Sequence, residues 1–327
     1  MKQLALACAL VLVVDTATAS VDTDPVGACT LSGKVSLSTT VYSAATSGSA
    51  LAVLNWTERR IDVTSLPSDS LVGRAHVDAR REKPSMRVVG WMPAESLPFA
   101  TKADVVVVPD HVWIRGGAAL RVLQPKAGDL EIEPRFPTFG KLRAGVGCGD
   151  LKLGTDSPKA GPTGPSKTYR FKSKSTKLYD AAGGKQVFTL ELLGATNTLD
   201  LEIRETKGAW HHLQWASNET VDGWLRAQDL VPVKDDDEGV FGALGGLGLS
   251  GSGKSVATAA MIAGRDTSVF LDTAKSALVA GVLEKGAKVR ATPSAPGFSA
   301  ITLWDHDVSA PAGKEFHVAT ADLQSAP

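Results

Sequence analysis

The stretch GLSGSGKS at residues 248–255 has the spacing of a phosphate-binding loop, G-x-x-x-x-G-K-S. In such a loop, backbone N–H groups surround the phosphates of a nucleotide, the lysine contacts them and the serine hydroxyl binds Mg²⁺. The residues at these positions are Gly248, Gly253, Lys254 and Ser255. A nucleotide site also requires a buried strand before the loop, a helix after it and a later strand that carries a metal-binding aspartate.

The sequence around this motif does not supply those elements. The many glycines between residues 239 and 248 oppose a central strand. SVATAAMIAG could form two or three helical turns before Gly264, but only 72 residues follow Ser255 and they read as strands. We therefore expect an acidic, glycine-rich linker at residues 234–266, with a P-loop nucleotide-binding protein as a remote alternative. A second alternative is a membrane-associated assembly factor that inserts Gly239–Gly264, because GALGG fits the G-x-x-x-G packing pattern.

No other residues have the spacing of an active site. His211 and His212 point to opposite faces of an expected strand, so they cannot bind one metal ion together. In WDHDV, Asp305 and Asp307 share one face and His306 lies on the other, which provides two ligands at most. Neither G-x-S-x-G nor H-E-x-x-H occurs. We expect a non-catalytic protein with no cofactor and no metal site.

The N-terminus predicts export from the cytoplasm. Residues 1–19, MKQLALACALVLVVDTATA, combine a short positive region, an apolar core and a small-residue cleavage pattern, as secretory signal peptides do. The mature protein is therefore expected in the periplasm, the cell envelope or the medium. The chain has 35 Lys and Arg against 35 Asp and Glu, so no net positive field exists to attract nucleic acid.

Two cysteines, Cys29 and Cys148, remain after removal of the signal peptide. An even count in an oxidising compartment favours a disulfide between them. Two separately buried thiols are the alternative. VGAC at residues 26–29 also resembles a lipid-attachment box on Cys29, but charged residues and a proline separate it from the apolar core.

One short pattern recurs at the ends of strand-rich stretches. GWMPAESL (90–97) and GWLRAQDL (223–230) align without a gap. FHVATADL (316–323) carries His317 at the tryptophan position, and AGVGCGDL (144–151) carries Gly145 there. Each copy closes a stretch of about five short expected strands, which is the scale of a small closed barrel.

The best of these stretches, KLYDAAGGKQVFTL…AWHHLQW…VDGWLRAQDL, resembles the bacterial SH3 domain family (SH3b). The resemblance implies an all-β chain of about four small SH3-like barrels in tandem, joined by Gly/Pro-rich linkers. The expected units are residues 29–98, 99–153, 169–233 and 267–325, with linkers at 154–168 and 234–266. The first two units are expected to pack as one lobe and the others to be tethered to it.

Exposed aromatic side chains are the best candidates for a binding surface, because SH3-like barrels recognise extended ligands with them. The candidates are Tyr179, Trp210, Trp215 and Trp224 in the third unit and Tyr42, Trp56 and Trp91 in the first. About two of the four in the third unit should belong to the core, and Trp215 is expected to be the most exposed. The predicted function is binding of peptidoglycan or of envelope protein peptides.

Overall fold

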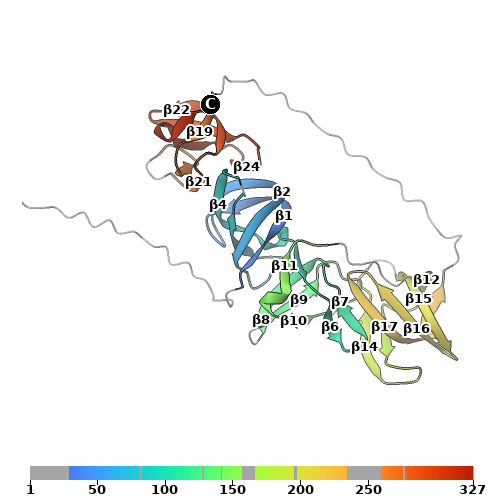
Figure 1. Cartoon of the computed structure of the whole chain (residues 1–327). Coiled ribbons are helices and arrows are strands. Elements are labelled where there is room, and N and C mark those ends of the chain that lie inside the picture. Colours follow the sequence, from blue (N-terminus) through green and yellow to red (C-terminus); the bar gives the residue numbers. More distant parts are fainter. Residues whose placement is uncertain are drawn as a thin grey trace, which may run out of the picture.

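The computed structural model describes residues 29–81, 83–126, 129–140, 142–156, 166–194, 197–233, 259–274 and 277–326. The described chain is all-β, as predicted: its strands are joined by turns and short 3₁₀ helices (Figure 1). The expected signal peptide and the motif residues Gly248, Gly253, Lys254 and Ser255 lie outside the described residues.

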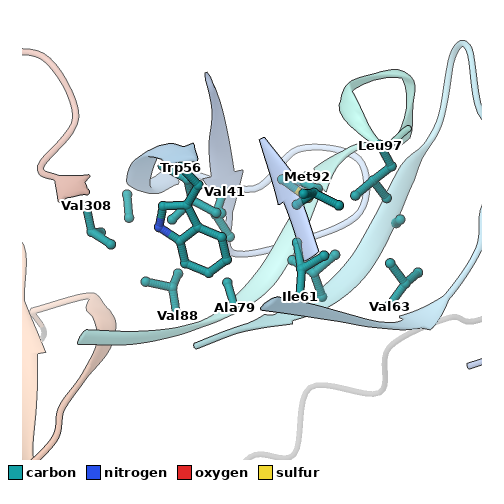
Figure 2. Packing of buried hydrophobic residues seen from close by; sticks show 14 of the residues in the cluster. Val41, Trp56, Ile61, Val63, Ala79, Val88, Met92, Leu97 and Val308 are labelled. Carbon is teal, nitrogen blue, oxygen red and sulfur yellow. The ribbon is translucent and has the colours of Figure 1, made fainter. Parts of the chain in front are cut away.

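The first segment, residues 29–98, is an antiparallel sheet that pairs back onto its own first strand. Its strands pair in chain order, and Tyr42 at the end of β1 pairs with Trp91 of β4. Alternate side chains of each strand face inward, where Trp56, Ile61 and Val88 pack together (Figure 2). The elements are β1 (Leu31–Tyr42), β2 (Ala50–Ser65), β3 (Arg74–Ala79), β4 (Met86–Pro93) and the 3₁₀ helix η1 (Ala94–Ser96).

The second segment, residues 99–153, has shorter strands. β8, β9 and β10 form one small sheet, β5 pairs with β11, and β6 forms a hairpin with β7. Its elements are β5 (Phe99–Thr101), β6 (Val105–Val108), β7 (Val112–Ile114), β8 (Leu120–Lys126), β9 (Asp129–Pro134), β10 (Ala144–Val146), η2 (Cys148–Asp150) and β11 (Leu151–Leu153).

The third segment, residues 166–233, is a single antiparallel sheet with the strand order β14-β13-β17-β16-β15-β12-β18. A tight hairpin joins β15 to β16, and Tyr179 of β13 pairs with Trp224 of β17. Its elements are β12 (Ser166–Phe171), β13 (Ser175–Tyr179), β14 (Gln186–Glu191), β15 (Thr198–Lys207), β16 (Trp210–Ala216), β17 (Glu219–Arg226), η3 (Ala227–Asp229) and β18 (Leu230–Pro232).

The fourth segment, residues 259–326, repeats the strand order of the third as β21-β20-β25-β23-β22-β19-β26. Phe270 of β20 pairs with His317 of β25, at the positions of Tyr179 and Trp224. Its elements are β19 (Ala259–Ala263), β20 (Thr267–Phe270), β21 (Val279–Leu283), β22 (Lys288–Ala295), β23 (Phe298–Leu303), β24 (Val308–Ser309), β25 (Phe316–Ala319), η5 (Thr320–Asp322) and β26 (Leu323–Ser325).

The recurring sequence pattern forms the same local structure in each of its four copies. Every copy runs from a strand into a three-residue 3₁₀ helix whose last residue is followed by a buried leucine. The leucine is apolar in every copy because it turns back into the core where the chain leaves the helix. These leucines are Leu97, Leu151, Leu230 and Leu323.

Two expected linker boundaries are wrong. β12 begins at Ser166, inside the linker expected at 154–168, and β19 lies inside the linker expected at 234–266. The alanine-rich run of β19 also does not form the helical turns that SVATAAMIAG suggested. Between Ala259 and Ala263 its backbone pairs with β22 on one side and with β26 on the other. These two sets of hydrogen bonds outweigh the intrinsic helix propensity of alanine.

Backbone pairing also joins segments that were expected to be held by linkers alone. β21 pairs with β4 and β24 pairs with β2, so the fourth segment lies against the first (Figure 1). β7 of the second segment pairs with β17 of the third. Flexible tethering of the third and fourth segments is therefore not what the structure shows.

The buried side chains of the described residues form two hydrophobic cores, and each core spans segments that are joined by strand pairing or lie next to each other. One hydrophobic core combines residues of the first, second and fourth segments, and Val308 of β24 lies beside the residues around Trp56 (Figure 2). A second core belongs to the third segment and includes Val112, Phe139 and Leu142 of the second.

The predicted disulfide is present between Cys29 and Cys148, with an S–S distance of 1.98 Å and a Cα–Cα distance of 5.5 Å. It joins the start of the first segment to η2 of the second. Because both sulfurs are bonded, Cys29 has no free thiol for a lipid.

Candidate binding surfaces

The third segment carries an aromatic surface, defined here as Tyr179, Trp210 and Arg226. Tyr179 lies on β13, Arg226 on β17 and Trp210 on β16, which pairs with β17 at Arg226. The rings of Tyr179 and Trp210 meet edge to face with centroids 4.9 Å apart. The Arg226 guanidinium carbon lies 6.0 Å from the Tyr179 centroid and 5.6 Å from that of Trp210. Two half-buried rings and an exposed cation therefore stand together on one face of the sheet.

Trp224 supports this surface from within. Only 7% of it is exposed, and its ring stacks on His212 with centroids 5.0 Å apart and an interplanar angle of 10°. His212 Nε2 lies 2.7 Å from Oδ1 of Asp222, whose other oxygen accepts a hydrogen bond from Gln214. The stack is thus held in place from the side, and Trp224 is a packing residue.

Trp215, expected to be the most exposed candidate, is buried. It is 8% exposed and packs edge to face on Phe139 of the second segment, with centroids 5.1 Å apart. On β16 it shares the inward face with Leu213, two residues earlier. The alternation of a strand therefore already assigned Trp215 to the core, and the neighbouring segment completes its burial.

The first segment repeats the arrangement with a substitution. Tyr42 lies beside Trp91, and the guanidinium carbon of Arg74 stands 3.6 Å from the Tyr42 centroid, at the place that Trp210 occupies in the third segment. His76 packs edge to face on Trp91, as His212 stacks on Trp224. Tyr42 is half-buried and Trp91 is 9% exposed.

Trp56, the remaining candidate of the first segment, belongs to the core. It is 2% exposed, and its indole Nε1 has no hydrogen-bond partner among the described residues. It is therefore not available to a ligand in this arrangement.

The fourth segment keeps the ring pair but loses the tryptophan. Phe270 and Phe298 meet edge to face with centroids 6.2 Å apart. His317 is half-buried, as expected for a residue replacing tryptophan, and its Nδ1 lies 3.1 Å from the Ser294 hydroxyl. In the second segment, Gly145 stands at the tryptophan position and pairs with Glu131, so this pair contains no aromatic ring.

The glycine before each tryptophan has a steric reason. A Cβ atom on Gly90 would lie 2.6 Å from the carbonyl oxygen of Tyr42, and one on Gly223 would lie 2.9 Å from Leu178 Cδ1. Because glycine has no side chain, the strand that carries the tyrosine can lie close to the backbone at these two positions. The Gly-Trp dipeptide therefore follows from the close strand approach beside each tyrosine.

Sequence reasoning missed Arg74, Arg226 and the two histidines that pack on tryptophans, His76 and His212. Period-two alternation places Arg226 on the face of Trp224 in β17 and His212 on the face of Trp210 in β16, so it could have found these two. Arg74 and His76 share one face of β3, but only the pairing of β3 with β4 places His76 opposite Trp91. Sequence reasoning also missed Trp304, which is 49% exposed.

The described residues offer little other chemistry. They contain no group of three or more His, Cys, Asp or Glu side chains that could hold a metal ion. Asp305 and Asp307, instead of forming an isolated polar cluster, make ion pairs with Arg81 and Arg59 of the first segment. No helix in the described part of the chain is long and apolar enough to cross a membrane.

Comparison with known proteins provides no functional assignment. No family model and no curated protein matches the chain. Among solved structures, NlpC2 from Trichomonas vaginalis is similar at a TM-score of 0.17 and 10% identity, over 50% of this chain and 49% of that one. The chain thus spans about half the length of that protein, and a likeness this low carries no argument.

Proposed function

We propose that this chain is an exported, non-catalytic binding protein built from tandem SH3-like units. The proposal is supported by the strand order shared by the third and fourth segments and by the 3₁₀ helix that closes all four. The disulfide fits an oxidising compartment, where such bonds persist.

We propose peptidoglycan or envelope protein peptides as the ligand. The observation that carries this proposal is the pair formed by Tyr179 and Trp210, with Arg226 beside both rings. Aromatic faces pack on the apolar faces of sugars and on peptide side chains, and a neighbouring guanidinium adds attraction for a carboxylate. Peptidoglycan presents sugar rings and peptide carboxylates together.

The arrangement of segments favours multivalent binding. Strand pairing fixes the first segment to the fourth and the second to the third, so surfaces on different segments keep a defined spacing. A repeating polymer can meet several such surfaces at once, and weak individual contacts then combine.

The test is co-sedimentation of the full chain with purified cell-wall sacculi. We expect Trp210→Ala to lower the affinity about tenfold, the loss typical of an aromatic contact at the centre of an interface. Phe136→Ala is the matched control, because Phe136 is 67% exposed and carries Arg135 at 5.6 Å, the same distance as Arg226 from Trp210. A wild-type chain that stays in solution, or equal losses in both variants, would refute the wall-binding proposal.

A further inference from the structure

The fourth segment has a cleft that the sequence did not indicate. Its volume is about 590 Å³, within the range of ligand-binding pockets. One wall is formed by β22 and β23, and the other by the chain from Val308 to Ala310 and from Lys314 to Phe316.

The cleft exists because short side chains replace bulky ones. Ala300 pairs with His317 as His212 pairs with Trp224, so Ala300 stands where the third segment has a stacked imidazole. Two residues further along β23, Thr302 stands where the third segment has Gln214. In the third segment this face is filled by the His212–Trp224 stack and its hydrogen bonds to Asp222. In the fourth segment Ala300 and Thr302 line open space.

The two segments also differ in whether the charged side chains on this face form ion pairs. In the third segment, Arg204 is paired with Asp222 and with Glu202. In the fourth, Arg290 and Lys314 both line the cleft, and neither forms an ion pair with a described residue. The Arg290 guanidinium carbon lies 4.9 Å from the ring centroid of Trp304, which orients it beside the cleft.

The remaining lining suits a peptide. Thr292 and Ser309 line the cleft, and their hydroxyl groups can both donate and accept hydrogen bonds. Ser294 also lines it, but its hydroxyl already lies 3.1 Å from His317 Nδ1. Glu315 lies on the same wall as Lys314 and reduces the net positive charge. Two cations and one carboxylate favour a ligand with a single carboxylate over a polyanion.

We propose that this cleft binds a short extended peptide through its carboxylate, held by Arg290 and Lys314, with the hydroxyl groups meeting the peptide backbone. The inference rests on the proposed binding function and adds to it a second site, whose chemistry differs from that of the aromatic surface. The aromatic surface offers two rings and one guanidinium, whereas the cleft offers two cations and small polar side chains.

The test is titration calorimetry of the full chain at low salt with two probes. One is an acetylated alanine peptide that contains one glutamate and ends in a carboxamide; the other is the same peptide with glutamine in place of the glutamate. We expect the acidic peptide to bind at least about tenfold more tightly, and Arg290→Gln and Lys314→Gln each to remove about tenfold, as for loss of one charge-assisted hydrogen bond. Arg135→Gln, which also removes a guanidinium that lies over an aromatic ring, should leave the affinity unchanged.

Ala300→His restores the side chain of the third segment and should block the cleft. Because this change alters packing, the Arg290 and Lys314 variants, both at exposed residues, test the proposal independently of it. Equal affinity for the two peptides, or equal losses in Arg135→Gln and Arg290→Gln, would overturn the inference. Sacculus binding without peptide binding rejects the cleft alone, whereas peptide binding without sacculus binding rejects the wall ligand and keeps the cleft.

Discussion

Replacing both bonded cysteines, in the variant Cys29→Ala/Cys148→Ala, is expected to destabilise the first two segments together. The bond spans 119 residues of sequence and closes a loop that contains both segments. In the folded protein, Leu153 of β11 already lies close to Gly33 of β1, because a Cβ atom on Gly33 would be 2.7 Å from Leu153 Cβ. This packing is absent from the unfolded chain, where the disulfide has its main effect.

The magnitude follows from the loop length. Closing a loop of more than 100 residues removes chain entropy from the unfolded state that corresponds to about 4–5 kcal/mol at 25 °C. Cys29 is 3% exposed, so truncation to alanine at that position also removes a small amount of packing. The expected loss of unfolding free energy is therefore about 4–5 kcal/mol, which corresponds to about a thousandfold increase in the population of the unfolded lobe.

Hydrogen–deuterium exchange measured by mass spectrometry can locate this loss. Peptides from β1–β4 and β8–β10 should exchange up to about a thousandfold faster in the variant at sites that open by global unfolding. Peptides from β12 and β15 serve as an internal reference, because these strands pair with each other within the third segment. An acceleration below about fivefold in β1–β4, equivalent to about 1 kcal/mol, would show that the reasoning from loop closure fails.

Two further predictions concern single residues. Glu219 is fully buried between the second and third segments, where Oε1 accepts hydrogen bonds from the backbone N–H groups of Thr138 and Phe139, and burial raises its pKa. The folded protein therefore keeps this proton to higher pH than the unfolded chain, so stability falls as pH rises from the ordinary glutamate range of about 4.3 through the raised pKa. Urea unfolding of wild type and Glu219→Gln should show a difference that changes over this window; a constant difference would contradict the titration of Glu219. Gly90→Ala should cost about 1–3 kcal/mol by thermal unfolding, because its Cβ would meet the Tyr42 carbonyl, whereas Gly149→Ala, with open space around it, should cost far less.

Short sequence patterns were enough to predict much of the fold. Period-two alternation predicted strands, and the Gly-Trp pattern located the positions where the chain turns through a 3₁₀ helix into a buried leucine. The two aromatic positions Tyr179 and Trp210 were also readable, because both lie on the outward face of strands with regular alternation. Trp215 was predicted to be exposed, although alternation along its strand places it on the inward face with Leu213.

The sequence by itself thus determined the all-β class, the repeated closing turn and the two cysteines that bond. The class and the turn depend on side-chain type and short spacing, and the disulfide follows from a count of two cysteines in an exported chain, all of which a linear sequence records. The tertiary structure alone decided that β19 is a strand, that β7 pairs with β17 and that β21 pairs with β4. Almost every residue type has the same backbone N–H and C=O groups, so the sequence does not show which distant strands form hydrogen bonds with each other. It also decided that Ala300 and Thr302 border a cleft, since an empty space is defined by the side chains that surround it from elsewhere in the chain.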